Sequence, residues 1–160
     1  MNQSPDIVLK PIGAVRSPIK EVTDDCGGGV AATIALDAQL FGPESTQGLD
    51  QFSHVEVIFL LNKIPAQSVE KGARHPRGRS AWPKMGIFAQ RSKDRPNRIG
   101  ITICERPFVK GPEIRVSELD AVDDTPVLDV KPYLKGFAPR GEVREPAWAD
   151  ELMAGYSCES

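Results

Sequence analysis

Cysteine and histidine are both scarce in this chain, which has three cysteines and two histidines among 160 residues. The cysteines stand far apart, at Cys26, Cys104 and Cys158, and their number is odd. This spacing argues against a disulfide framework and against a paired-cysteine zinc site, so we expect no bound metal. Cys104 lies in an apolar run with no histidine nearby in the sequence to activate it, and we therefore expect a buried thiol rather than a nucleophile.

Long hydrophobic runs are also absent, and no window approaches the roughly 18 uninterrupted apolar residues that a membrane-spanning helix needs. No apolar run follows a basic start, so we expect a soluble, cytoplasmic protein without a secretory leader. Its 160 residues, 40% of them hydrophobic, are enough for one domain with a substantial core. We therefore expect a single domain over residues 1–160, with no room for a second catalytic domain.

Helical periodicity is rare, and short runs of strand character take its place. The expected strands cover residues 7–16, 29–36, 52–61, 86–90, 99–105, 113–122 and 127–130. Fourteen glycines and fourteen prolines are spread among them, which favours a mainly β fold: one closed or nearly closed antiparallel β-barrel without exposed edges. A helix is expected at about residues 146–155, between a proline and a glycine, for packing within the chain or for a dimer contact.

Formal charge is nearly balanced over the whole chain but is strongly segregated along it. Residues 71–98 hold nine Lys or Arg against one acidic residue, whereas residues 113–160 hold eleven acidic residues against five basic ones. The basic segment fits local contact with a phosphate backbone, or simply a solvated surface. A mobile basic loop is expected at about 71–85, where Trp82 either stacks on a splayed base or folds back on the core.

A tight basic turn joins two of the expected strands, in the run GIFAQRSKDRPNRIGITIC from residue 86 to residue 104. Pro96 and Gly100 argue against a continuous strand here, and Asn97 tolerates turn geometry. We expect a rigid loop that presents four cations at fixed positions: Arg91, Lys93, Arg95 and Arg98. This arrangement suits an anionic ligand.

A second candidate segment is AVDDTPVLDVKPY at residues 121–133, in which Asp123 and Asp124 precede a Thr-Pro turn. The strand that follows carries Asp129 and Lys131 two residues apart, so both lie on one face. A carboxylate here could bind a ribose hydroxyl or an amine, and Lys131 could bind a phosphate. The alternative is a structural Asp-Pro turn with an ion pair between Asp129 and Lys131.

Four ordered blocks of this chain resemble a known family. They are IGAVRSP at residues 12–18, GLDQFSH at 48–54, GIFAQRSKDRPNRIG at 86–100 and VDDTPVLDVKPY at 122–133. Their sequence and spacing are similar to those of the TsaA-like (TrmO-type) methyltransferases, in a short single-domain form. The resemblance implies S-adenosyl-L-methionine as cofactor and methylation of N6 of threonylcarbamoyladenosine next to the tRNA anticodon. It also implies a homodimer with the pocket near the subunit contact.

The same resemblance implies which residues contact the cofactor. The family's contacts fall on these positions of the chain: Asn62, Arg91, Ile101, Val122, Asp123, Asp124 and Thr125. The chain departs from the family pattern at the pair Asn62-Lys63, which is His-Gln in many members. Two further departures are Arg98, which replaces a proline, and Asp124, which replaces a glycine. If that glycine has a positive φ, we expect Asp124 to adopt the same left-handed conformation at modest cost.

Substrate contacts are assigned to polar groups on the two segments: Arg95, Asn97, Arg98 and Lys131. An acylated N6 is a poor nucleophile, so loss of its proton during transfer would help and a general base is expected. Asp123, Asp129 and Tyr133 are the candidates, and the sequence does not choose among them. His54 is interpreted as a structural histidine.

Two other functions stay open. The same cofactor site could act on another RNA or on a small acidic substrate, which Arg98 and Asp124 would favour. The chain could also bind S-adenosylmethionine or RNA without transferring a methyl group. The expected partners are the anticodon region of tRNA and a second copy of the chain, with no membrane.

Overall fold

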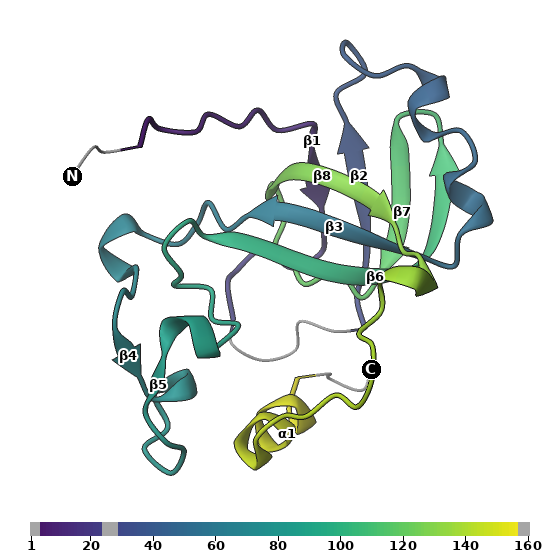
Figure 1. Ribbon diagram of the computed structural model, residues 1–160. Helices are drawn as coiled ribbons and strands as arrows, with labels where there is room; N and C mark the ends of the chain where they lie inside the picture. The colour runs from purple at the N-terminus through teal and green to yellow at the C-terminus, as the bar shows by residue number, and fades with distance from the viewer. Residues whose placement is uncertain (1–3, 24–28, 157–160) are drawn as a thin grey trace.

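Six antiparallel strands close into a barrel in the order β1-β2-β7-β6-β3-β8 (Figure 1). The structure is a computed structural model that describes residues 4–23 and 29–156. The barrel strands are β1 (Gly13–Arg16), β2 (Ala31–Leu36), β3 (His54–Leu60), β6 (Ile99–Lys110), β7 (Glu113–Ser117) and β8 (Pro126–Pro132). This arrangement confirms the predicted mainly β fold, because closure gives every barrel strand a neighbour on both sides.

Alternate residues of the barrel strands point inward and form the hydrophobic core. In β3, Val55, Val57 and Phe59 are buried, while the residues between them are half-buried on the outer face. Cys104 of β6 pairs with Val55 and is fully buried, as predicted. Burial raises the pKa of its thiol to about 12. A thiol with that pKa stays protonated at neutral pH, so Cys104 is part of the core rather than a nucleophile.

At two glycines of the barrel, neighbouring atoms lie closer to the backbone than a side chain would allow. A Cβ added to Gly13 of β1 would fall on the backbone carbonyl oxygen of Ala35 in β2, and one added to Gly100 of β6 would fall on the Phe59 ring. Gly13 pairs with a strand on each side, β2 and β8. The glycines of two of the four sequence blocks therefore have a role in closing and packing the barrel.

Two predicted strands are shorter in the structure. Of residues 7–16 only β1 forms, because its ladders with β2 and β8 both end at Gly13. Ile7 and Val8, beyond that point, are 86% and 83% exposed. The strand predicted at 113–122 ends at Ser117, since Glu118 takes a left-handed φ of 67° that an extended strand does not accommodate.

The other strands differ in smaller ways. β6 continues past the predicted end at residue 105 and through Pro107, where a shift of register between Glu105 and Phe108 accommodates the proline. The strand predicted at 86–90 is divided, because Ile87–Ala89 turns as a 3-10 helix. The boundaries of β2, β3 and β8 lie within two residues of the prediction.

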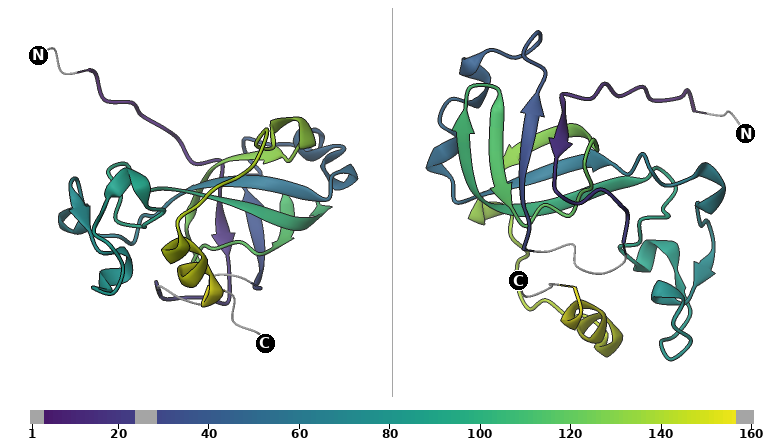
Figure 2. Two further views of the ribbon diagram at one scale, coloured as in Figure 1. Left: turned by 60° about the horizontal axis from the view of Figure 1, so that its bottom comes forward. Right: turned by 180° about the vertical axis from the view of Figure 1, so that it is seen from behind.

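Residues 62–98 form a module that connects β3 to β6 and lies beside the barrel (Figures 1 and 2). Its strands β4 (Ala73–Arg74) and β5 (Met85–Gly86) pair antiparallel. The predicted basic loop at 71–85 thus contains β4, the 3-10 helix Pro76–Gly78 and the start of β5. The amide of Gln90 fixes it by donating to the carbonyls of Arg74 and Met85, at 3.1 and 2.7 Å.

The helix α1 (Ala147–Ala154) follows Pro146 and ends before Gly155, as predicted for residues 146–155. Short 3-10 helices occupy Pro43–Thr46, Leu49–Gln51, Ala66–Ser68, Pro76–Gly78, Ile87–Ala89 and Lys135–Phe137. Among residues 4–23 and 29–156, no helix is long and apolar enough to cross a membrane.

Candidate functional site

Three loops meet at one end of the barrel and enclose a small cavity of about 80 Å³. They follow β1, follow β3 and precede β8, and Lys93 of the 62–98 module joins them. The predicted cofactor residues Asn62, Val122 and Thr125 all line this cavity. The other lining residues are Ile19, Glu21, Val22, Thr23, Leu61, Lys63, Ile64, Lys93, Asp120 and Ala121.

The turn at residues 122–125 is held against β1 by main-chain hydrogen bonds. The Asp124 amide donates to the Val15 carbonyl at 2.7 Å, and the Val15 amide donates to the Thr125 carbonyl at 2.9 Å. Asp124 has a φ of 64°, the left-handed conformation expected of a residue in a glycine position. The turn is thus fixed although this chain has no glycine there.

Asp123 connects the same turn to the loop that follows β1. Its carboxylate accepts a hydrogen bond from the Ser17 amide at 2.9 Å and forms an ion pair with Lys20 at 2.7 Å. The Lys20 ammonium, and then the Ser17 amide, hold the pKa of this carboxyl below its ordinary value. Asp123 is therefore an anion at neutral pH that orders two cavity loops, and its lowered pKa makes it a weak base.

Arg91 and Ile101, the other two predicted cofactor contacts, lie against each other. The Arg91 guanidinium donates to the Ile101 carbonyl at 3.0 Å. Both side chains are exposed and neither lines the cavity. The Arg91 charge lowers the pKa of Tyr156, whose hydroxyl donates to the cavity residue Asp120.

The two predicted substrate arginines also donate hydrogen bonds to main-chain carbonyls of the 62–98 module. Arg95 donates to the Gln90 carbonyl at 2.9 Å, and Arg98 donates to the carbonyl of the cavity residue Ile64 at 2.7 Å. Arg98 has a φ of 51°, which a proline could not adopt, so the turn here differs from the RPNP pattern. Asn97 is exposed in this turn. The predicted turn is present, but three of its four predicted ligand cations, Arg91, Arg95 and Arg98, donate to main-chain carbonyls.

The remaining candidates lie along the outer face of the barrel. Asp129 and Lys131 form an exposed ion pair at 2.5 Å, the structural alternative considered for this strand. Tyr133 packs edge-on against His54, at the opposite end of β3 from Asn62. His54 itself shares a hydrogen bond of 2.7 Å with the Ser53 hydroxyl. Within one chain, the structure does not bring Asp129, Lys131 or Tyr133 to the cavity.

Trp82 is folded back on the protein. Its side chain is only 7% exposed, and its indole N–H donates to Glu151 of α1 at 2.6 Å. The Arg79 guanidinium lies 5.1 Å from the ring centroid, and His75 bonds the Trp82 carbonyl. Stacking of this ring on an RNA base, one of the two roles considered, is therefore not available in this structure.

Sequence reasoning missed Asp120 and Tyr156. Asp120 lines the cavity and lies three positions before Asp123, within reach of the motif. Tyr156 donates to Asp120 at 2.6 Å across 36 residues of sequence. No local sequence pattern predicts that contact.

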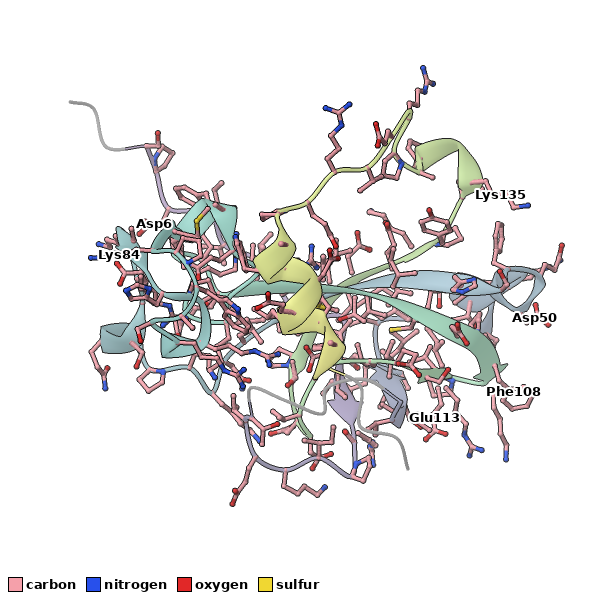
Figure 3. The ribbon with its side chains drawn as sticks, turned by 90° about the horizontal axis from the view of Figure 1, so that it is seen from below. Asp6, Asp50, Lys84, Phe108, Glu113 and Lys135 are labelled. Carbon is pink, nitrogen blue, oxygen red and sulfur yellow. The ribbon has the colours of Figure 1, made fainter. Side chains whose placement is uncertain are left out.

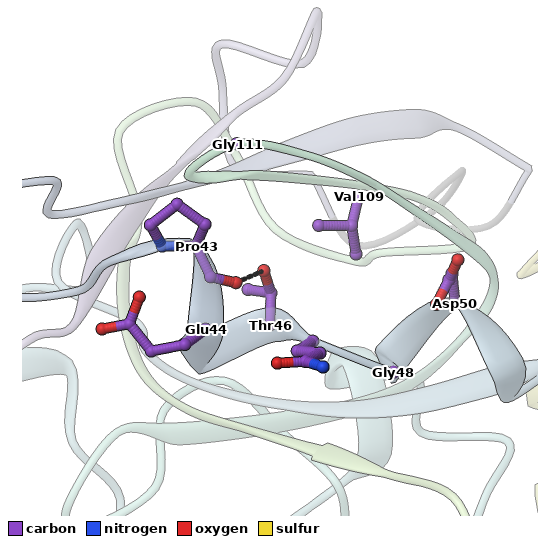
Figure 4. A pocket seen from close by; sticks show the side chains of 8 residues that line it. Pro43, Glu44, Thr46, Gly48, Asp50, Val109 and Gly111 are labelled. Carbon is purple, nitrogen blue, oxygen red and sulfur yellow. Dashed lines mark hydrogen bonds between the residues drawn. The ribbon is translucent and has the colours of Figure 1, made fainter.

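A larger open pocket of about 670 Å³ lies elsewhere, between the 3-10 helices that precede β3 and the β6–β7 turn (Figure 4). It is lined by Pro43, Glu44, Thr46, Gln47, Gly48, Asp50, Val109 and Gly111. None of the predicted cofactor or substrate residues lines it. The smaller cavity is therefore the candidate site, because three of the predicted cofactor residues line it.

Residues 21–138 match the family described as the tRNA-methyltransferase O N-terminal domain. The chain belongs to this family. Its fold is also that of solved TrmO structures. It superposes on TrmO from Pseudomonas aeruginosa with a TM-score of 0.73 and 25% identity, covering 92% of this chain and 64% of that one.

Relatives of this TrmO-family chain carry different names. The tRNA (adenine(37)-N6)-methyltransferase of Homo sapiens is 40% identical over 117 residues, 72% of this chain but 26% of the human protein. The enzyme of the same name from Escherichia coli is 35% identical over 136 residues, 79% and 57% of the two chains. A probable S-adenosyl-L-methionine-binding protein from Pyrococcus abyssi is 35% identical over 144 residues, 86% and 74%. This chain spans about a quarter of the human protein.

Proposed function

We propose that this chain is an S-adenosylmethionine-dependent methyltransferase that acts on N6 of threonylcarbamoyladenosine next to the anticodon in tRNA. The observation that carries the proposal is the meeting of Asn62, Val122 and Thr125 around one cavity in a TrmO-family barrel. The names of the human and Escherichia coli relatives support the reaction and the tRNA substrate. The name of the Pyrococcus abyssi relative supports the cofactor.

The cavity residues fit the chemistry of this cofactor. Leu61, Ile64 and Val122 provide apolar surface for a nucleoside base, while Glu21 and Asp120 provide carboxylates for hydroxyl groups or an ammonium. Lysines at 63 and 93 supply positive charge for a carboxylate. A zwitterionic nucleoside therefore finds complementary groups on every side.

When bound, S-adenosylmethionine supplies an electrophilic methyl group on a sulfonium. The protein then has to align this group with the substrate nitrogen and exclude water, and no covalent intermediate is needed. The bonds of Asp123 and Asp124 to the β1 region keep the cavity loops in place for that alignment. Of the predicted general bases, Asp123 lies next to the cavity and its pKa is lowered, which makes it a weak base. Asp129 and Tyr133 lie away from the cavity and would serve as the base only from a second copy of the chain.

The test is methyl transfer from labelled S-adenosylmethionine into tRNA that carries threonylcarbamoyladenosine, beside tRNA that lacks it. We expect label on the modified adenosine alone, identified by nucleoside digestion and mass spectrometry. Cofactor binding is measured in parallel by calorimetry. Binding without transfer to either tRNA would favour a second candidate, a protein that binds S-adenosylmethionine without this activity, as the name of the Pyrococcus abyssi relative suggests. Label on another acceptor would show that the chain methylates a different substrate.

We also propose that the chain acts as a homodimer through the outer face of β6. Ile99, Ile101 and Ile103 occupy alternate positions there and are 39%, 44% and 49% exposed. The cavity of about 80 Å³ is well below the roughly 300 Å³ of a typical small-molecule site. The cofactor would therefore extend toward Arg91 and Ile101, where a second copy seated on the isoleucines would enclose it.

Substitution of Ile99 and Ile103 by Glu is expected to convert a dimer into a monomer, because like charges replace apolar contacts at the centre of the proposed interface. Light scattering on a size-exclusion column measures the molar mass. Phe108→Glu is the matched control, since Phe108 is 58% exposed further along the same strand. A wild-type protein that is already monomeric at all concentrations would contradict this part of the proposal.

A further inference from the structure

The C-terminal segment lies outside the family match, which ends at residue 138, and it folds back onto the candidate site. Figures 1 and 2 place α1 below the barrel, beside the 62–98 module. Two side-chain hydrogen bonds anchor it. Trp82 donates to Glu151 within α1, and Tyr156, just after α1, donates to Asp120, each at 2.6 Å.

Tyr156 connects the C-terminal segment to the candidate site. Its hydroxyl bonds Oδ2 of Asp120, which lines the cavity. Burial, followed by the Asp120 carboxylate, raises the pKa of Tyr156, while the Arg91 guanidinium acts in the opposite direction. Tyr156 is thus a protonated donor at neutral pH, hydrogen-bonded to a cavity residue.

Few local contacts fix the orientation of the Asp120 side chain. It follows Glu118, which has a φ of 67°, in an irregular loop between β7 and β8, and its side chain is exposed. An exposed carboxylate on such a loop samples several rotamers unless a partner holds it. Tyr156 is that partner, and its bond to Oδ2 leaves Oδ1 outside the interaction.

We propose that Tyr156 is a positioning residue, which fixes the Asp120 carboxylate so that it accepts hydrogen bonds from the hydroxyl or ammonium groups of the nucleoside cofactor. The C-terminal segment, outside the matched domain, thereby completes the cofactor site. This inference rests on the proposed function, because it takes the cavity to be the S-adenosylmethionine site.

The experiment is a double-mutant cycle on cofactor affinity in the full chain, with Tyr156→Phe, Asp120→Asn and the double variant. Calorimetry measures the dissociation constant for S-adenosylmethionine. Each single variant is expected to weaken binding about fivefold, the effect of one hydrogen bond of about 1 kcal/mol. The double variant should bind no more weakly than Asp120→Asn alone, because Tyr156 acts only through Asp120.

Met153→Ala is the matched control on the same segment, since Met153 is 52% exposed and lies three residues before Tyr156. Thermal unfolding of every variant reports whether the fold is intact. Two results would overturn the inference: Tyr156→Phe binding within twofold of wild type, or losses that add independently in the double variant. Absence of binding by the wild-type chain would refute the proposed function instead, so the two failures are distinguishable.

Discussion

Reversing three charges on the 62–98 module, by Lys71→Glu, Arg79→Glu and Lys84→Glu, is expected to lower tRNA affinity on the order of 100-fold at low salt. The affinity for S-adenosylmethionine should not change. All three side chains are exposed, whereas Arg74, Arg95 and Arg98 hold the module together. An RNA backbone would therefore contact the first set and not the second.

The salt dependence of tRNA binding shows whether the three side chains act through contacts with phosphates. Each phosphate contact contributes about 0.7 to 0.9 to the slope of log affinity against log salt, so the triple variant should lose about 2 to 3 from that slope. Filter binding over a series of salt concentrations measures it. Because Arg79 also stacks on Trp82, thermal unfolding is recorded to establish that the module remains folded.

The control carries the same change of charge on the other side of the molecule: Lys110→Glu, Arg115→Glu and Lys135→Glu, all at exposed positions. Figure 3 shows Lys84 and Lys135 at opposite sides. We expect this variant to bind tRNA within a few-fold of wild type. Equal losses in the two triple variants would mean that net charge, and not a local surface, governs binding.

Replacing Gly13 by Ala is expected to lower the melting temperature by about 5–10 °C. The added Cβ meets the Ala35 carbonyl, which is backbone and cannot turn away as a flexible side chain would. Overpacking of this kind costs about 2–3 kcal/mol, and a domain of this size loses about 2–4 °C for each kcal/mol. Differential scanning calorimetry gives the measurement.

Gly136→Ala is the matched substitution, because a Cβ at Gly136 has nothing within 4 Å in the described structure. Its melting temperature should stay within about 2 °C of wild type. If both variants melted alike, the close approach of β1 to β2 would not be a constraint on the fold.

The sequence predicted the barrel from local strand and turn signals. Asn62, Val122 and Thr125 were implied as cofactor contacts by the family resemblance, and in the structure they lie on loops after β3 and before β8 that line one cavity. The conformation of Asp124 was predictable for the same reason, since only a few residue types adopt a positive φ. Cys104 was recognisable as core from the apolar alternation of its own strand.

What the sequence could not predict depends on contacts between distant segments. Trp82 packs through a bond to Glu151, which lies 69 residues further along the chain. Whether Arg95 and Arg98 face a ligand or donate to main-chain carbonyls depends on the path of the 62–98 module around them. Neither the composition nor the spacing of the basic segment distinguishes a cation used inside the fold from one presented to solvent.

The 62–98 module leaves and rejoins the barrel at one hydrogen bond, from the Leu61 amide to the Arg98 carbonyl at 2.8 Å. Since β3 and β6 are neighbours, the two strands amount to a hairpin whose turn has been replaced by a folded insert. Doubling the length of a loop adds only about 0.6 kcal/mol to its closure. A change of length between residues 65 and 92, away from the cavity residues at both ends of the module, therefore costs little in loop closure and leaves the register of β3 and β6 intact.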